Sequence, residues 1–90
     1  MPETVSLTLI GKPECHLCED ARVIVKSVMA DLEGEPSAPT IALEELSILD
    51  DSGLFEKYVE EIPVLLLNGR VHNIWRIDAA RLRSAILDAR

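Results

Sequence analysis

Hydrophobic and polar positions follow two different periods in the first third of the chain. Residues 5–10 alternate with β-branched character, and Gly11-Lys12-Pro13 after them is typical of a turn. From about residue 15 to residue 32 the apolar positions recur in steps of three and four, which is the period of a helix with one buried face. That face comprises Cys18, Ala21, Val25, Val28 and Leu32. The pattern predicts a strand, a turn and a long helix.

The middle of the chain predicts a second strand and a short helix. A loop over residues 34–39 precedes a strand over residues 40–46, although two adjacent glutamates interrupt the alternation of that strand. Asp50, Asp51 and Ser52 are residue types that cap helix N-termini. The apolar side of the helix that they introduce is expected to contain Leu54, Phe55, Tyr58 and Val59.

The last third predicts a hairpin and a closing helix. Residues 64–67 are continuously apolar, which suits a strand covered on both faces. Asn68-Gly69 is a strong hairpin signal because the turn requires positive φ at both positions, and the returning strand covers residues 70–75. Asp78 is a good N-cap for the last helix. The buried residues of that helix are expected to be Ala79, Leu82, Ile86 and Ala89.

The order of these elements indicates an α/β fold. A right-handed crossover between the first two strands and an antiparallel hairpin at the end give a four-stranded mixed sheet flanked by three helices, in the order β-α-β-α-β-β-α. The 90 residues suffice for one domain, which we expect to span residues 1–90. The turn after the first strand then lies at the carboxyl end of that strand, where open α/β sheets bind their ligands.

Composition and charge restrict the partners and the location of the protein. A content of 48% hydrophobic residues argues for a globular chain, and a formal charge of -7 disfavours nucleic acid and anionic membranes as partners. The first residues lack the pattern of a signal peptide, and the longest apolar run, residues 63–67, is too short to span a bilayer. We therefore expect a cytoplasmic monomer that binds neither nucleic acid nor membrane.

The candidate chemistry lies in Cys15-His16-Leu17-Cys18, which holds both cysteines of the chain. Two cysteines are too few for a disulfide scaffold, so the pair is expected to be catalytic or metal-binding. The unpaired amides and the dipole of a helix N-terminus stabilise a thiolate, which lowers the pKa of cysteines in such motifs. A positive charge on Lys12 or His16 would add to this effect. We expect Cys15 to attack a disulfide and Cys18 to resolve the mixed disulfide.

The spacing of the two cysteines suggests that their disulfide forms and breaks readily. Residues three apart on a regular helix have β-carbons about 5 to 6 Å apart, whereas a disulfide prefers about 3.8 Å. Closing a bond between Cys15 and Cys18 is therefore expected to need a local adjustment. Strained, accessible disulfides are the readily reduced ones.

Two segments far apart in the sequence combine into a family pattern. Residues 11–18 read Gly-Lys-Pro-Glu-Cys-His-Leu-Cys between a strand and a helix, and about 40 residues later residues 61–65 read Glu-Ile-Pro-Val-Leu, followed by Asn68-Gly69. With these segments the chain resembles the small glutaredoxin-like proteins of the thioredoxin superfamily over nearly its whole length. The resemblance implies a thioredoxin-like fold. It also implies a cis Ile62-Pro63 bond beside Cys15, with the backbone of Ile62 pairing with an extended substrate segment.

The chain departs from that family pattern at two places. Typical glutaredoxins carry Pro-Tyr between their cysteines, where this chain has His16-Leu17. The family's Gly-Gly before a late Asp, part of its glutathione site, is replaced here by Trp75-Arg76, and without glycines a close backbone approach to glutathione is sterically disfavoured. Lys12 matches the family's glutathione-contacting lysine. The predicted catalytic residues are Cys15 and Cys18, and the predicted substrate-binding residues are Lys12, His16, Leu17, Ile62 and Pro63.

The expected function is that of a thiol-disulfide oxidoreductase that reduces protein or low-molecular-weight disulfides. It requires no resident cofactor or metal, and glutathione or a thioredoxin reductase would supply electrons. Two alternatives stay open. The cysteines are soft ligands that suit an iron–sulfur cluster shared between subunits or another metal, although His16 and His72 do not complete a four-ligand zinc site. The chain is alternatively a non-catalytic binding module that uses the Ile62-Pro63 edge.

Overall fold

The computed structural model describes residues 4–89, which form the predicted order of four strands and three helices. The strands are β1 (Thr4–Gly11), β2 (Thr40–Ser47), β3 (Val64–Leu67) and β4 (Arg70–Ile74). The helices are α1 (His16–Glu33), α2 (Ser52–Tyr58) and α3 (Ala79–Asp88). The predicted α/β fold is confirmed.

The strands form one mixed sheet in the order β2-β1-β3-β4. β1 runs parallel to β2 and antiparallel to β3, and β3 and β4 form the predicted hairpin. Asn68 and Gly69 have φ of 52° and 84°, as the turn requires. The Ser6 amide donates to Asn68 Oδ1 at 2.9 Å, and the Asn68 amide donates to the Ser6 carbonyl at 2.8 Å. The hairpin turn is thereby attached to the central strand.

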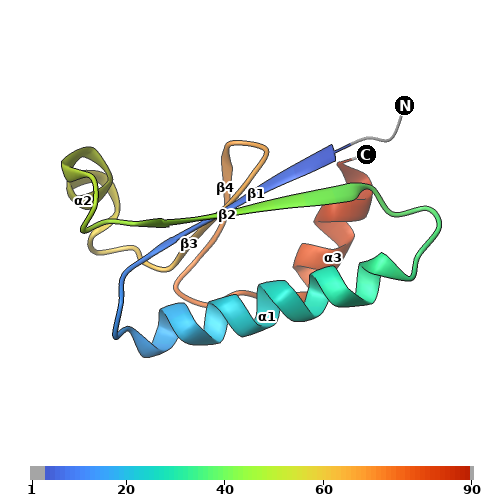
Figure 1. Ribbon diagram of the computed structural model, residues 1–90, viewed down its shortest axis with the longest axis horizontal. Coiled ribbons are helices and arrows are strands. Elements are labelled where there is room, and N and C mark those ends of the chain that lie inside the picture. The colour runs from blue at the N-terminus through green and yellow to red at the C-terminus, as the bar shows by residue number, and fades with distance from the viewer. Residues whose placement is uncertain (1–3, 90) are drawn as a thin grey trace.

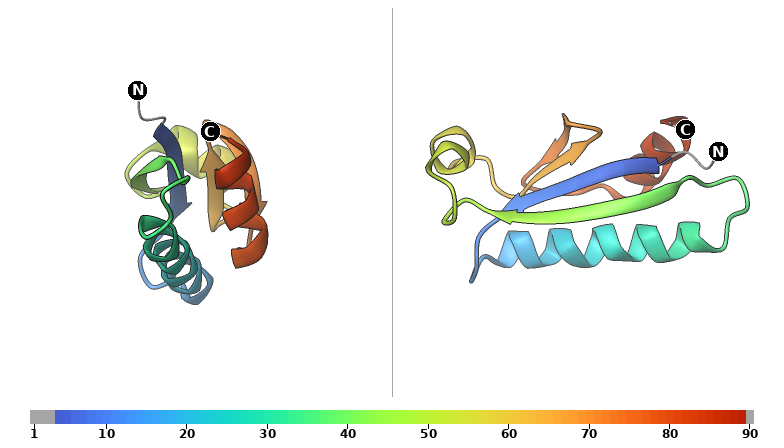
Figure 2. Two further views of the ribbon diagram at one scale, coloured as in Figure 1. Left: turned by 90° about the vertical axis from the view of Figure 1, so that its right-hand side faces the viewer. Right: turned by 45° about the horizontal axis from the view of Figure 1, so that its top comes forward.

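The helices are distributed unequally over the two faces of the sheet (Figures 1 and 2). α1 and α3 lie together on one face, whereas α2 lies toward the other face at the end of the sheet where α1 begins. The larger core cluster fills the space under α1 and α3; its residues are Val5, Leu7, Leu9, Ala21, Val25, Val28, Leu32, Leu65, Ile77, Leu82 and Ile86. The smaller cluster lies at the α2 end and comprises Ile10, Ile48, Tyr58 and Val64.

Burial of α1 agrees with its sequence pattern at every predicted position. The buried residues of this helix are Cys18, Ala21, Val25, Val28 and Leu32. The last four of these residues pack on the β1 side chains that alternate toward the same face, whereas Ile10 belongs to the cluster on the opposite side. One end of this buried stripe is a cysteine, so the core of the protein extends to the dithiol.

Four of the positions expected on the apolar faces of α2 and α3 are exposed. Phe55 and Val59 are 44% and 38% exposed, since only Leu54 and Tyr58 of the seven-residue α2 pack against the smaller cluster. Ala79 and Ala89 are exposed because they occupy the first position and the C-cap of α3. The turns of α3 that pack on the sheet bury Leu82 and Ile86 instead.

Strand ends also differ from the prediction by one residue. β2 continues to Ser47, and β4 stops at Ile74 rather than at residue 75. Trp75 has φ of 64°, which a β-strand residue does not adopt. Within the described residues no helix is both long and apolar enough to cross a membrane.

Candidate active site

The segment between β1 and α1 presents the two cysteines at the start of the helix. Glu14 has φ of 59° and turns the chain, and Cys15 then adopts an extended conformation with φ of -115° and ψ of 114°. Cys15 is therefore the N-cap of α1 rather than its first helical residue. The Cys18 amide donates a hydrogen bond of 3.3 Å to Cys15 Sγ. The cysteine sulfur thus satisfies one of the amides that every helix N-terminus leaves unpaired.

The two sulfur atoms lie much closer than regular helical spacing suggests. Cys18 Sγ donates a hydrogen bond of 2.6 Å to Cys15 Sγ, and both cysteines are free. The extended conformation of Cys15 directs its side chain back over the first turn of the helix, where it also accepts from the Cys18 amide. An S–S bond is about 2.05 Å long. Only a small movement of the sulfurs separates the dithiol from a disulfide.

The two cysteines differ in accessibility and in protonation. Cys15 is half-buried, whereas Cys18 is 6% exposed. Burial raises the pKa of Cys18 from 9.0 to about 11, and its hydrogen bond to Cys15 acts in the same direction, whereas Lys12 opposes the shift. Cys18 is therefore a protonated donor at neutral pH. Cys15 Sγ accepts two hydrogen bonds, one from the Cys18 amide and one from the Cys18 thiol.

Gly11 is a site residue that the sequence pattern does not single out. A β-carbon on Gly11 would lie 2.9 Å from Cys18 Sγ and 3.2 Å from Cys18 Cβ. The missing side chain leaves the space that the Cys18 sulfur occupies. The available signal is a glycine at the end of a strand directly before a dithiol turn, but it indicates only a strand terminus.

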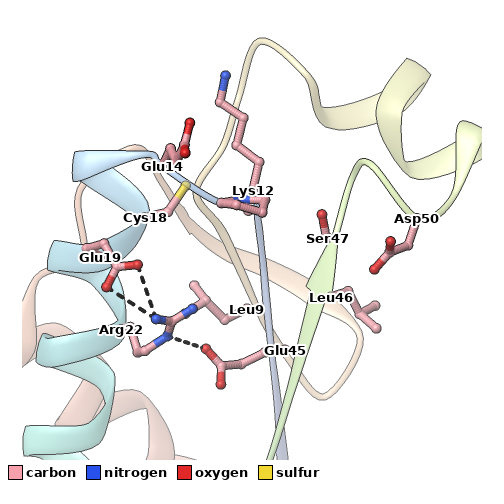
Figure 3. Close-up of a pocket in the computed structure, with 12 residues that line it drawn as sticks. Leu9, Lys12, Glu14, Cys18, Glu19, Arg22, Glu45, Leu46, Ser47 and Asp50 are labelled. Atoms are coloured by element: carbon pink, nitrogen blue, oxygen red, sulfur yellow. Dashed lines mark hydrogen bonds and ion pairs between the residues drawn. The ribbon is translucent and has the colours of Figure 1, made fainter.

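A cavity of about 380 Å³ borders Cys18 on the side of β2 (Figure 3). Arg22 spans it, with its guanidinium 2.6 Å from a Glu45 oxygen and 3.2 Å from Glu19. The Lys12 side chain extends away from this cluster, although Lys12 and Cys18 line the same cavity. The remaining lining residues are Leu9, Gly11, Pro13, Glu14, Leu46, Ser47 and Asp50. The sequence does not predict the Arg22–Glu45 pair, because Arg22 lies on α1 and Glu45 on β2.

The other predicted substrate-binding residues have different surroundings. Ile62 and Pro63 are joined by the cis bond that the family resemblance implies; Pro63 is buried and Ile62 packs against the smaller core cluster. His16 is exposed at the first position of α1, and Leu17 is 38% exposed. Leu17 lines a second cavity together with Trp75. From the sequence, Trp75 is expected only at the end of a strand and, with Arg76, in place of the family's glycines.

The histidines do not join the cysteines in a metal-binding group. Within residues 4–89 no cluster of three or more His, Cys, Asp and Glu side chains is arranged to hold a metal ion. His72 lies half-buried on β4, and its Nε2 atom is buried without a hydrogen-bond partner. Burial lowers the pKa of His72, and the charge of Arg81 adds to this effect, whereas Asp78 opposes it.

Most of the chain matches a known family of proteins. The family model described as Glutaredoxin-like domain (DUF836) matches residues 6–87. The chain belongs to this glutaredoxin-like family. The uncharacterized protein Rv0508 of Mycobacterium tuberculosis is 32% identical to our glutaredoxin-like protein over 87 residues, which cover 94% of this chain and 82% of that one.

Solved structures agree with this assignment. The X-ray structure of target protein XcR50 from X. campestris has a TM-score of 0.63 and 33% sequence identity. The match covers 93% of the glutaredoxin-like chain and 97% of the XcR50 chain. The crystal structure of chloroplastic thioredoxin z has a TM-score of 0.72 at 10% sequence identity. The match covers 98% of the glutaredoxin-like chain and 81% of the thioredoxin z chain. The second similarity concerns the fold alone, and it identifies the architecture as thioredoxin-like.

Proposed function

We propose that this glutaredoxin-like protein is a thiol-disulfide oxidoreductase that reduces disulfides of proteins or small molecules. The contact between the two sulfurs carries the proposal: half-buried Cys15 accepts hydrogen bonds from the amide and the thiol of Cys18, which is buried behind it. This arrangement favours attack by Cys15, because a thiolate is the reactive form of cysteine. It also keeps Cys18 protonated and close at hand for a second step.

The reaction proceeds through two exchanges at sulfur. Cys15 thiolate attacks one sulfur of the substrate disulfide, a mixed disulfide forms, and the second substrate sulfur leaves as a thiolate that takes up a proton. Cys18 then loses its proton and attacks Cys15 Sγ. The Cys15–substrate bond breaks, the remaining substrate thiolate departs, and a Cys15–Cys18 disulfide remains. Two electrons have passed from the dithiol to the substrate.

The oxidised protein then needs an electron donor to complete a cycle. We propose glutathione or a thioredoxin reductase as donor, with no resident cofactor, and a reducing compartment such as the cytoplasm as the location. The replacement of glycines by Trp75-Arg76 argues against close backbone contact with glutathione. Equilibration of the dithiol in glutathione buffers, followed by turnover assays with each donor, decides between the two.

Paired serine variants test the proposed function. We expect Cys15→Ser to abolish reduction of hydroxyethyl disulfide, and Cys18→Ser to accumulate a mixed disulfide detectable by intact-protein mass spectrometry. His16→Ala, which changes an exposed residue between the two cysteines, is expected to retain the ability to form the intramolecular disulfide. Full turnover by Cys15→Ser would refute the assignment.

The same variants separate the oxidoreductase from the two alternatives. An iron–sulfur or metal carrier purified without oxygen would show charge-transfer absorption that both serine variants lose. A non-catalytic binding module would retain its partner after Cys15→Ser and would show no reductase activity before the substitution.

A further inference from the structure

A second cavity lies between the N-terminal half of α1 and the segment after β4. It measures about 230 Å³ and is lined by Leu17, Asp20, Ala21, Ile24, Trp75, Arg76 and Ile77. Leu17 lies between Cys15 and Cys18 in the sequence, so the first turn of α1 supplies both the dithiol and one lining residue of the cavity. Pockets that enclose a whole small-molecule ligand usually measure about 300 to 1,000 Å³. This cavity is smaller and suits a single side chain.

Trp75 forms one wall of this cavity in a strained and fixed conformation. Its φ of 64° lies in the left-handed region, where a bulky residue is rarely found. The Trp75 amide donates to the Pro63 carbonyl at 2.8 Å, and the indole Nε1 donates to the Glu60 carbonyl at 3.1 Å. The side chain nevertheless remains 54% exposed. Backbone strain of this kind is concentrated at functional sites.

The opposite wall is apolar, and Leu17 is its exposed residue, whereas Ala21 is buried. Leu17 is 38% exposed, and Ala21 and Ile24 from the next turn of α1 continue the surface below it. The charged lining residues are one acid and one base, Asp20 and Arg76, so the cavity favours neither sign of charge. The chemistry therefore matches an uncharged apolar group. Tryptophan side chains are also the anchors that most often carry binding energy at protein interfaces.

We propose that Trp75 and Leu17 are specificity-determining residues, which accept an apolar side chain located next to the disulfide of a polypeptide substrate. The inference rests on the proposed oxidoreductase function and defines its substrate class. A substrate held in this way has its apolar residue between α1 and the Trp75 segment while its disulfide faces Cys15. Small polar disulfides lack this contact and react without it.

Two matched peptides test the preference. In each peptide the single cysteine is joined to 2-mercaptoethanol by a disulfide, which is the bond to be reduced. The two peptides differ only in the residue beside that cysteine, which is Leu in one and Ser in the other. Hydroxyethyl disulfide serves as the small substrate. We expect kcat/KM for the Leu peptide to exceed that for the Ser peptide about tenfold, because a buried leucine gains hydrophobic stabilisation that serine lacks. Trp75→Ala and Leu17→Ala should each reduce this ratio toward one. Val23→Ala, an exposed apolar position of α1 outside the cavity, is the control and should keep the ratio.

The single tryptophan of the chain offers a second measurement that does not depend on turnover. In Cys18→Ser protein, a trapped mixed disulfide with the Leu peptide should shift Trp75 emission to shorter wavelength, and the Ser peptide should not. Leu17→Ala should reduce the shift, which keeps the test valid if Trp75→Ala does not fold.

The outcomes distinguish this inference from the proposed function. Equal kcat/KM values for the two peptides, together with reduction of hydroxyethyl disulfide, would overturn the inference and leave the oxidoreductase function intact. Failure of the wild-type protein to reduce any of the three substrates would refute the proposed function, and the inference with it.

Discussion

Cys18 Sγ lies against the backbone of Gly11, in the space that a side chain at that position would fill. A β-carbon added to Gly11 would lie only 2.9 Å from the sulfur, which is below the range of ordinary contacts. Gly11 ends β1 and Cys18 lies in the first turn of α1, so this contact joins the sheet to the dithiol helix. The resolving position of the proposed reaction therefore depends on a residue without chemistry of its own.

Gly11→Ala is expected to destabilise the reduced protein by about 1 to 3 kcal/mol, which is typical of overpacking in a core. The added methyl group must displace the Cys18 sulfur or shift the end of β1. Urea denaturation under reducing conditions measures the effect. Gly34→Ala is the matched control, because Gly34 has φ of -85° and nothing within 4 Å of an added β-carbon. A stability of Gly11→Ala equal to that of the control would contradict the steric argument.

The burial of Cys18 predicts a loss of stability in alkaline solution. Its pKa of about 11 in the folded protein exceeds the ordinary value of 9.0, so between these pH values the unfolded chain has released a proton that the folded chain still holds. The free energy of unfolding therefore falls as pH rises from about 9 to about 11. We expect the difference in unfolding midpoint between reduced wild type and Cys18→Ala to change across this window. A difference that stays constant with pH argues against the burial effect.

The lowered pKa of His72 predicts that the folded protein loses stability in mildly acidic solution. Burial lowers its pKa in the folded protein, so as pH falls below about 6.5, the ordinary value, the unfolded chain takes up the proton first. The contribution of His72 to the free energy of unfolding is fully present above that pH and is lost as pH falls toward the pKa of His72 in the folded protein. We expect His72→Phe to remove this component of the decline, as measured by thermal unfolding between pH 7 and pH 5. A decline that His72→Phe leaves unchanged would contradict the burial effect.

Local features of the sequence determined most of the fold. The three- and four-residue steps of α1 identified all five of its buried residues, because helical periodicity depends only on neighbouring residues. Asn68-Gly69 and Asp78 defined a hairpin turn and a helix start for the same local reason: each acts through its own backbone conformation or through an amide three residues away. The exposed Phe55 and Val59 show the limit, since apolar character alone does not reveal how far a short helix covers a sheet.

The sequence by itself also identified the dithiol and its position at a helix N-terminus, because the cysteine spacing and the change of period are both visible in it. Only the tertiary structure decided the surroundings of the sulfurs. The contact of Gly11 with Cys18, the Arg22–Glu45 pair and the bond from Trp75 to the Glu60 carbonyl each join different segments of the chain. Their distances depend on how the sheet and helices pack, and no periodic pattern encodes that packing. Burial and hydrogen bonding set the chemistry of a thiol, so the reactivity of this pair is a property of the folded chain.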